Sequence, residues 1–423
     1  MATYFIDPHS GCDLSDGLSE KNPRKSYTDL HLQGGDYVLF KRGSFVRGKL
    51  ETKSGESGAP ITYGAYGEGT KPTFCGSLDI TNPELWRSIG DCKWKYLGHL
   101  PTEVGNMIYN GGGEFGTLRW SVEELCGQGD FYDSRFGITH PSATEYCCFK
   151  DLGITGEIVI YSEENPGNYY KSIECAPFLG GRLAAIDHDT VFSELAFINS
   201  GVHAICGSGI NISILGCDFI NIGGAVIRKE QKLRFGNAIE FWEICEGCEV
   251  VDCYFDNIYD SGITHQGKLN QILPKNNRFD RNRFYRCGMA AYECRDFIPQ
   301  NTSFSENLCD AAGEGFSALG ETMPRFSEIW PLPMGHHLFI WRIRNKTEGS
   351  SLTVKNNKFM GAKYGGAIFA LGVKEMYADY EVDGNGYLEG GMLLTAYLSD
   401  TEYKTLSEFT DACGMDRNGY VIS

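Results

Sequence analysis

The chain has 423 residues, a length that suits two or three average domains or one continuous, repetitive all-β body. It carries 38 Lys and Arg against 55 Asp and Glu, a net charge of -17, which argues against a surface that binds nucleic acid and favours a neutral partner. No stretch approaches about 18 apolar residues and no basic leader precedes an apolar run, so we expect no membrane span and a cytoplasmic location, or secretion if a leader was trimmed.

The pattern along the chain changes at three points, which divide it into four parts: residues 1–79, 80–180, 181–395 and 396–423. The first part is predicted to form an N-terminal cap and the first coils of a β-helix. The second carries no repeat but alternates strongly, as in "GEIVIYS", and is predicted to be an inserted β-rich module. The third contains the repeat of a parallel β-helix core. The last is a cap in which Leu406, Phe409 and Cys413 share a helix face that ends at Gly414.

The 16 cysteines are scattered rather than spaced as a disulfide framework, and a chain this long can build its core without cross-links. We therefore expect reduced thiols and no disulfide. Cys245 and Cys248 are separated by two residues, but no second pair or suitably spaced histidines complete a zinc site. The sequence predicts no metal and no other cofactor, apart from the Ca²⁺ that a lyase would use.

Six segments between Ile210 and Tyr387 share a repeat with three aligned columns. The first column is apolar and holds Ile214, Val250, Phe279, Phe304, Val354 and Val382. The second holds Cys217, Cys253, Asn282, Asn307, Asn357 and Asn385, and the third holds Phe219, Phe255, Phe284, Cys309, Phe359 and Tyr387. Asparagines stacked at a turn can bond to one another along a solenoid and tolerate left-handed backbone, so the columns predict stacked coils.

The copies are separated by about 22 to 50 residues, which favours coils of three short strands with loops inserted at one corner. The predicted fold class is therefore all-β, a right-handed parallel β-helix. A β-propeller or a leucine-rich solenoid is the alternative, but neither a WD-type nor an L-x-x-L-x-L signature occurs.

Several segments resemble the pectate-lyase-like β-helix carbohydrate-active enzymes, and most of all the bacterial β-helix glycoside hydrolases. These segments are "YFIDPHSGCDLSDGLS", "GDYVLFKRGSFVRGKL", "SGAPITYGAYGEGTKPTF", "GNAIEFWE" and "IYDSGITHQG". The resemblance spans most of the chain. It implies the fold and an activity on glycans but not one sugar, since the family includes exo-acting enzymes such as β-xylosidases and lacto-N-biosidases.

A second strand follows each corner of the repeat, and period-two alternation divides its side chains between interior and exterior. The predicted inward column is Ile205, Ile239, Ile263, Tyr292, Phe316 and Ile368. Two predicted outward rows are Glu240, Thr264, Glu293 and Ser317, and Trp242, Gln266, Arg295 and Leu319. The residues before the inward column are small and are also predicted to face outward: Ala204, Ala238, Gly262, Ala291, Gly315 and Ala367. Together these rows predict a groove with a flat floor and one polar wall.

Glu240 and Glu293 are predicted to lie two coils apart, with backbones about 9.6 Å from each other. This spacing suits the two carboxyl groups of an inverting glycosidase, one as acid and one to activate water. Asp260 lies one coil from each and can replace either, in which case the shorter spacing favours retention. An outward acid on a β-helix is usually solvated surface, so the hypothesis depends on the clustering with Trp242 and Arg295.

The predicted substrate-binding residues are Trp242, Thr264, His265, Gln266, Arg295, His337 and Trp341. Trp242 is a platform for a sugar ring or packs beneath a loop, and Arg295 binds substrate or neutralises a nearby glutamate. His265 has inward parity, so it is either a core histidine or lies where the strand has already turned outward. The long insertion between Cys309 and Leu352, which includes Trp330, either closes one end of the groove or contributes a core strand.

The leading functional hypothesis is a glycoside hydrolase that acts on an oligosaccharide, and exo-action is expected because loops at both ends would block a long polymer. The first alternative is a polysaccharide lyase, which needs an Arg or Lys base and often Ca²⁺, with Arg295, Lys268 and Asp296 as candidates. The second is a non-catalytic carbohydrate-binding β-helix. The sequence does not predict an oligomeric state.

Overall fold

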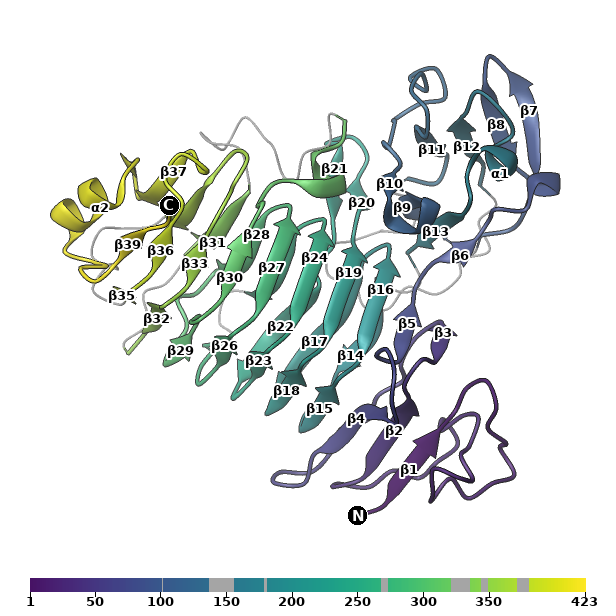
Figure 1. The fold of residues 1–423 in the computed structure, drawn as a ribbon, viewed down its shortest axis with the longest axis horizontal. Coiled ribbons are helices and arrows are strands. Elements are labelled where there is room, and N and C mark those ends of the chain that lie inside the picture. The colour runs from purple at the N-terminus through teal and green to yellow at the C-terminus, as the bar shows by residue number, and fades with distance from the viewer. Residues whose placement is uncertain are drawn as a thin grey trace.

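The computed structural model describes residues 1–100, 102–136, 156–178, 181–267, 273–320, 335–343, 349–370 and 380–423. Over these ranges the chain is an all-β, right-handed parallel β-helix with an inserted β-rich module and a short C-terminal helix. The coils lie side by side along the long axis of the molecule (Figure 1). No helix in these ranges is long and apolar enough to span a bilayer.

Most coils contribute one strand to each of three sheets, which we name A, B and C. Sheet A contains β1 (Thr3–Ile6), β2 (Tyr37–Lys41), β4 (Ile61–Tyr66), β15 (Thr190–Ser193), β18 (Ile212–Leu215), β23 (Glu249–Val251), β26 (Arg278–Asp280), β29 (Thr302–Ser303), β32 (Leu352–Lys355) and β35 (Tyr380–Asp383). Sheet B contains β3 (Phe45–Arg47), β5 (Thr73–Cys75), β16 (Ala196–Ser200), β19 (Asp218–Ile222), β24 (Tyr254–Ile258), β27 (Arg283–Cys287), β30 (Leu308–Asp310), β33 (Lys358–Phe359), β36 (Gly386–Tyr387) and β39 (Tyr420–Val421). Sheet C contains β14 (Arg182–Ile186), β17 (His203–Ile210), β22 (Ile239–Glu246), β25 (Ser261–Gln266), β28 (Ala290–Arg295), β31 (His336–Trp341), β34 (Gly366–Ala370), β37 (Leu394–Leu398) and the antiparallel β38 (Thr401–Tyr403).

The apolar columns of the repeat stack along the interior, as predicted. On sheet B, Phe219 pairs in register with Phe255 and Phe255 with Phe284, and their rings stack at 4.9 and 4.6 Å. Fully burying one such side chain stabilises the fold by about 1.5–3 kcal/mol, so each coil is held mainly by its neighbours. The cysteines in the described ranges carry free thiols, and Cys217 and Cys253 are buried in this core.

The asparagine column forms a ladder between sheets A and B. Asn307 donates from Nδ2 to Oδ1 of Asn357 at 3.0 Å, and Asn357 donates likewise to Asn385 at 2.9 Å. The backbone N–H of Asn282 donates to Oδ1 of Asn307 at 2.8 Å. The expectation that these asparagines adopt left-handed backbone is wrong, because the positive φ falls on the residue before each, for example 59° at Glu306. The asparagines instead satisfy the polar groups that each corner would otherwise bury.

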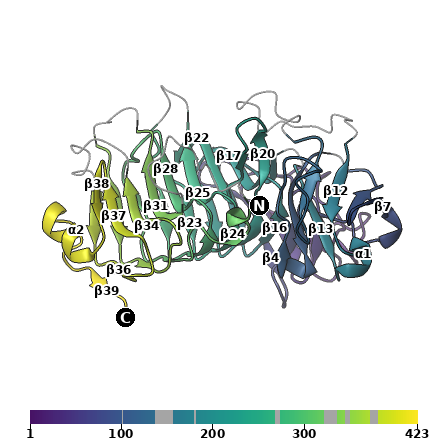
Figure 2. The ribbon, with the colours of Figure 1, turned by 90° about the horizontal axis from the view of Figure 1, so that it is seen from above.

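The inserted module follows β5 and precedes β14. It contains two antiparallel sheets, one of β6 (Leu78–Asp79), β9 (Val104–Tyr109), β10 (Glu114–Phe115) and β13 (Ile173–Pro177), and one of β7 (Trp86–Gly90), β8 (Lys93–Tyr96), β11 (Phe131–Asp133) and β12 (Ile158–Tyr161). The short helices η1 (Pro83–Leu85), η2 (Asn110–Gly112) and α1 (Pro166–Tyr169) connect them. Figures 1 and 2 place the module and α2 (Leu406–Cys413) at opposite ends of the long axis.

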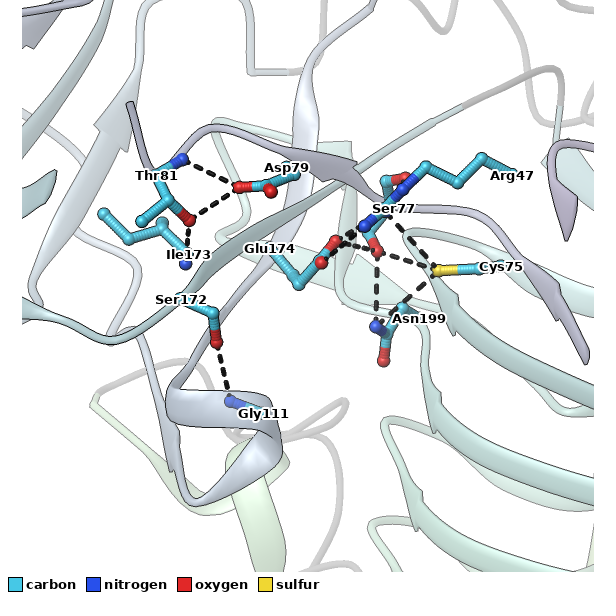
Figure 3. Close-up of polar contacts among 10 residues, drawn as sticks. All are labelled: Arg47, Cys75, Ser77, Asp79, Thr81, Gly111, Ser172, Ile173, Glu174 and Asn199. Carbon is cyan, nitrogen blue, oxygen red and sulfur yellow. Dashed lines mark hydrogen bonds and ion pairs between the residues drawn. The ribbon is translucent and has the colours of Figure 1, made fainter. Parts of the chain in front are cut away.

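A polar cluster fastens the module to the coils (Figure 3). Arg47 of β3 donates from both terminal nitrogens to Glu174 of β13, each at 2.7 Å, and Ser77 donates to the same carboxylate at 2.6 Å. Asn199 of β16 in turn donates to the Ser77 hydroxyl at 3.2 Å. A bidentate guanidinium–carboxylate pair fixes direction as well as distance, so it orients the module on sheet B.

The C-terminal helix α2 ends at Gly414, as its sequence predicts. Thr405 caps its first turn by accepting from the backbone N–H of Glu408 at 3.2 Å, and Gly414 ends it with a φ of 69°. Leu406 and Phe409 are its buried residues and join the main core. The helix therefore covers apolar surface at the last coils.

Candidate active site on sheet C

The two predicted catalytic glutamates lie on β22 and β28 of sheet C. Register pairs Glu240 with Thr264 of β25, and Thr264 with Glu293. Cys206 of β17 lies on the other side of Glu240. Because adjacent strands are about 4.8 Å apart, the backbones of the glutamates are about 9.6 Å apart. We name Cys206, Glu240, Thr264 and Glu293 the carboxylate row; Glu240, Thr264 and Glu293 have the order that alternation predicts.

The coil after β28 differs from the prediction. The segment around Phe316 forms the 3-10 turn η4 (Gly315–Ala318), and Gly315 has a φ of 79°, which an extended strand does not use. The strand of this coil is β31, which pairs with β28 and places Phe339 beside Glu293. The predicted strand positions are therefore wrong for Phe316, Ser317 and Leu319.

The row of small residues faces the interior rather than a groove. Ala204, Ala238, Ala291 and Ala367 belong to the main core, and a Cβ on Gly262 would meet the ring of Phe284 at 2.6 Å. The predicted flat floor is wrong because strict alternation does not hold here. Two successive residues of a strand both belong to the main core, as Ala238 and Ile239 do, and as Ala291 and Tyr292 do.

This break in the alternation brings a further set of polar residues to the outer face, three positions before the carboxylate row. They are His203, Asn237 and Ser261. None of the three was among the residues predicted from the sequence. Their signal is the recurrence of a polar residue three places before Cys206, Glu240 and Thr264 in successive copies of the strand.

Glu240 is a buried carboxylate held by three side chains. His203 Nε2 lies 2.9 Å from Oε2, Asn237 Nδ2 donates to Oε2 at 3.0 Å, and Gln266 Nε2 donates to Oε1. Burial raises the pKa of Glu240, but His203 and the two amides outweigh it and lower the pKa to about 2. Glu240 is only 2% exposed, so these side chains, rather than solvent, stabilise its charge.

His203 carries its proton on the nitrogen that faces Glu240. The backbone N–H of Asn237 donates to His203 Nδ1 at 3.1 Å, so Nδ1 is unprotonated. The ring nitrogen that faces the carboxylate is therefore Nε2, which lies 2.9 Å from Glu240 Oε2. The ring also packs edge-on against Phe235 at 5.5 Å, which fixes its plane.

Gln266 links Glu240 to Arg295 on the next strand. Arg295 can only donate, so its contact from Nη1 turns Gln266 Oε1 toward the guanidinium and Nε2 toward Glu240. The guanidinium also lies over the ring of Trp341, 4.9 Å from its centroid. Predicted binding residues Gln266, Arg295 and Trp341 thus form one connected network beside the carboxylates.

Glu293 is as buried as Glu240 but borders aromatic groups. Trp341 Nε1 donates to its Oε1, and Ser261 Oγ donates to its Oε2 at 3.2 Å. The neighbouring surface of sheet C is an apolar cluster of Met289, Ala290, Phe339, Trp341, Phe369, Leu394 and Tyr397. The two carboxyl groups of the row therefore have different surroundings, which is the condition under which two carboxyl groups take different roles.

Asp260, the third predicted catalytic residue, serves another partner. Its Oδ2 accepts from the backbone N–H of Gly236 at 3.1 Å. Burial lowers the pKa of the fully buried Arg234, and the negative charge of Asp260 opposes this effect. Arg234 lies over the Tyr259 ring at 4.5 Å and donates to the carbonyl oxygen of Gly105 in the module at 2.9 Å. These contacts favour a structural role for Asp260.

Two further residues of the site are placed for contact with a ligand. Thr264 lies between the glutamates, and its buried Oγ1 has no hydrogen-bond partner in the part of the chain that the structure describes. Trp242 follows Glu240 by two residues, pairs in register with Gln266 and is half-buried. Both positions agree with the predicted outward rows.

Two histidines predicted to bind substrate lie in the interior instead. His265 Nδ1 is 3.0 Å from the Tyr292 hydroxyl, and burial lowers the pKa of His265 to about 4. His337 stacks on the core ring of Phe359 at 5.7 Å. Their predicted roles are wrong because both side chains are directed away from the carboxylate row. Trp330 and Lys268 lie outside the described residues.

A possible metal-binding group overlaps this site. Ligand atoms of His203, Cys206 and Glu240 lie within 4.8 Å of one another. A histidine that binds a metal almost always donates its other ring N–H to an acceptor, whereas His203 Nδ1 accepts from a backbone donor. The donor set also differs from the all-oxygen set that Ca²⁺ prefers. The arrangement therefore fits a proton-donating histidine better than a metal ligand.

Comparison with known proteins gives a likeness in structure and none in sequence family. No family model matches the chain, and no curated protein matches it. A structure described as XylC in complex with xylose is similar over 94% of this chain and 70% of that chain, with 11% identity and a TM-score of 0.52. A glycoside hydrolase is similar over 100% and 96% at 9% identity with a TM-score of 0.44, and a rhamnogalacturonan lyase over 95% and 75% at 12% identity with a TM-score of 0.39.

The similar structures include right-handed β-helix carbohydrate-active enzymes. The likeness to XylC, at this low identity, establishes the fold of the chain and no more. A shared fold does not determine the reaction, which depends on the residues of the site.

Proposed function

We propose that this chain is a carbohydrate-active enzyme, and specifically a glycoside hydrolase that cleaves an oligosaccharide with inversion. The observation that carries the proposal is the spacing of two buried carboxylates, Glu240 and Glu293, on strands separated by one strand. Backbones about 9.6 Å apart suit the roughly 6.5–9.5 Å between carboxyl groups of inverting enzymes and not the 5–5.5 Å of retaining ones.

Glu240 acts as the base in this scheme. With a pKa of about 2 it is ionised at any pH near neutrality, which makes it a weak base but a permanent negative charge. That is sufficient when the transition state resembles an oxocarbenium ion, because water loses its proton only after its bond to carbon has begun to form. Thr264, whose buried hydroxyl has no partner among the described residues, is placed to hold that water.

Glu293 acts as the acid. A proton on its Oε2 can be shared with Ser261, which accepts as well as donates, while the Trp341 indole N–H holds Oε1. Glu293 gives this proton to the departing glycosidic oxygen as that bond breaks, and Glu240 takes one from the attacking water. The sum is the addition of one water, and solvent restores both carboxyl groups.

The lyase alternative has less support. A lyase needs a base that loses its proton, and Arg295 is held as a cation by its contacts with Gln266 and the Trp341 ring. The second candidate base, Lys268, lies outside the described residues. The half-buried Trp242 offers an aromatic surface for a sugar ring, and the xylose bound to XylC makes pentose-containing oligosaccharides a reasonable first substrate set.

The proposal is tested by turnover of a panel of aryl glycosides and oligosaccharides, followed by NMR of the product anomer that forms first. Glu240→Gln and Glu293→Gln are each expected to fold and to lose 10²- to 10⁴-fold in turnover. The turnover of Glu293→Gln should fall less on an aryl glycoside, whose leaving group needs no protonation, than on an oligosaccharide. The turnover of Glu240→Gln should fall equally on the aryl glycoside and the oligosaccharide. The exposed Glu306→Gln serves as the matched control.

Three results would overturn this proposal. Full activity of both glutamine variants would remove its catalysts. A product of retained configuration, together with a loss of turnover in Asp260→Asn equal to that of a glutamine variant, would indicate that Asp260 and one glutamate, one coil apart, are the catalytic pair. An unsaturated product that absorbs ultraviolet light would identify a lyase.

A further inference from the structure

A cleft of about 280 Å³ opens beside β14, at the N-terminal end of sheet C. One wall is β14 and the other is the segment from Lys49 to Thr52, whose Leu50 pairs with Ala184 of β14. Leu50 is buried in the main core, so its neighbours Lys49 and Glu51 are free to face the cleft.

The cleft continues the face that carries the glutamates. Register pairs Ala185 of the cleft with Cys206, and Cys206 with Glu240. Arg182, which also lines the cleft, pairs in the same way with His203. The cleft therefore lies two strands from Glu240, or about 9.6 Å along the sheet, on the side away from Glu293.

The charged groups of the cleft have few polar contacts within the described part of the chain. Lys49, Glu51 and Arg182 make no side-chain hydrogen bond or ion pair within the ranges that the structure describes. Asp187 accepts from the Thr52 hydroxyl at 2.6 Å and has its second oxygen left for a ligand. Two cationic donors and two carboxylate acceptors thus line a space of about one sugar ring.

This mixture of charges selects the kind of ligand. An anionic group would be repelled by the two carboxylates, and a cationic group by the lysine and the arginine. The vicinal hydroxyls of a neutral sugar satisfy both, because each hydroxyl accepts from a cation and donates to a carboxylate. We propose that this cleft is a remote subsite that binds one neutral, hydroxyl-rich sugar unit of an oligosaccharide substrate.

This inference rests on the proposed function, because the proposed catalytic pair determines where the bond is cleaved. If that bond lies near Thr264, between the two glutamates, the cleft is three strands away, about 14 Å. A sugar in the cleft is then separated from the bond by at least one further unit. Substrates longer than a disaccharide should gain affinity that shorter ones cannot reach.

The test measures binding without turnover, in the Glu240→Gln enzyme, by calorimetry. The probes are xylo-, cello- and manno-oligosaccharides of two and four units, with tetragalacturonate as the charged counterpart. For one neutral series the tetrasaccharide is expected to bind at least tenfold more tightly than the disaccharide. Arg182→Gln and Lys49→Gln should abolish this gain and change disaccharide binding by less than twofold.

Arg283→Gln, which removes an exposed arginine of β27 on sheet B, is the matched control and should leave the gain intact. A tetrasaccharide that binds no better than its disaccharide, a gain that survives in the Arg182→Gln enzyme, or tighter binding of tetragalacturonate would each overturn the subsite. If the gain is present and depends on Arg182 while the parent enzyme hydrolyses no glycoside, the subsite stands and the hydrolase proposal fails. If the enzyme hydrolyses a glycoside but the tetrasaccharide binds no more tightly than the disaccharide, the hydrolase proposal is supported and the subsite is overturned.

Discussion

The ionisation of Glu240 is expected to make the stability of the fold depend on pH in a defined window. Its pKa is about 2 in the folded chain, against an ordinary value of 4.5. The unfolded chain therefore binds a proton at this site between about pH 4.5 and pH 2, where the folded chain does not. Stability from this group is fully present above about pH 4.5 and is lost as the pH falls toward 2.

The size of the effect follows from that difference. At about 1.4 kcal/mol for each pH unit, the group contributes roughly 3 kcal/mol to the free energy of unfolding at neutral pH. Because Glu240 is 2% exposed, screening by solvent reduces this value little. Replacing it with Gln keeps the shape of the side chain and removes the titration, so the variant should lack this part of the pH dependence.

Urea unfolding at intervals from pH 7 to pH 2.5 measures the effect, with the Glu306→Gln enzyme as control. The parent and the control should lose about 2–3 kcal/mol more than the Glu240→Gln enzyme over this range. His203→Gln should reduce the loss as well, since it removes the group 2.9 Å from Oε2. Equal losses in the parent and the Glu240→Gln enzyme would refute the idea that Glu240 is held as a buried carboxylate by His203 and the two amides.

Two other substitutions test the network and the ladder. Trp341→Phe keeps an aromatic ring and removes the indole N–H that donates to Glu293, so turnover should fall about 10- to 100-fold, as when a buried acceptor loses its donor, while Trp94→Phe in the module should leave turnover unchanged. Asn307→Ala leaves the buried backbone N–H of Asn282 without its acceptor and should lower the free energy of unfolding by about 2–4 kcal/mol; a change below about 0.5 kcal/mol would contradict the ladder.

The register of the central strands of sheet C could be predicted because one inward position recurs in every copy. Ile205, Ile239, Ile263 and Tyr292 pair in register as expected. Once that column is aligned, the positions one and three residues later are determined, and with them the place of Glu240 relative to Glu293. The spacing of the proposed catalytic pair was therefore present in the sequence.

The errors have two physical causes. Alternation assumes that successive side chains face opposite sides, but near the start of the sheet C strands two successive residues both face the interior. Gly262 is therefore turned inward and Ser261 lies on the outer face. Alignment by apolar pattern also fails where a long insertion interrupts the repeat, because both "GFSAL" and the later "HHLFIW" fit the same column. Only the pairing of β31 with β28 decides between them.

The contacts within the site were beyond the sequence for a different reason. Trp341 was predicted to meet substrate, but its partner Glu293 comes from a strand 48 residues away, so their bond depends on the register of β31. The proton of His203 is set by a backbone N–H that precedes Glu240 by three residues. Neither relation leaves a pattern in residue types alone, since side-chain direction and tautomer are fixed only by the fold.

A parallel β-helix restricts the separation of catalytic groups to steps of one strand. Outward residues on neighbouring strands have backbones about 4.8 Å apart, close to the spacing of a retaining pair. The second possible separation, between residues on strands with one strand between them, is about 9.6 Å and leaves room for a water. The proposed pair, Glu240 and Glu293, has the second spacing, and the intervening position holds Thr264, a small residue whose hydroxyl has no partner in the described parts of the structure. A larger residue there would close the space between the carboxylates. The identity of the residue on β25 therefore matters as much for the proposed reaction as the two glutamates on either side of it.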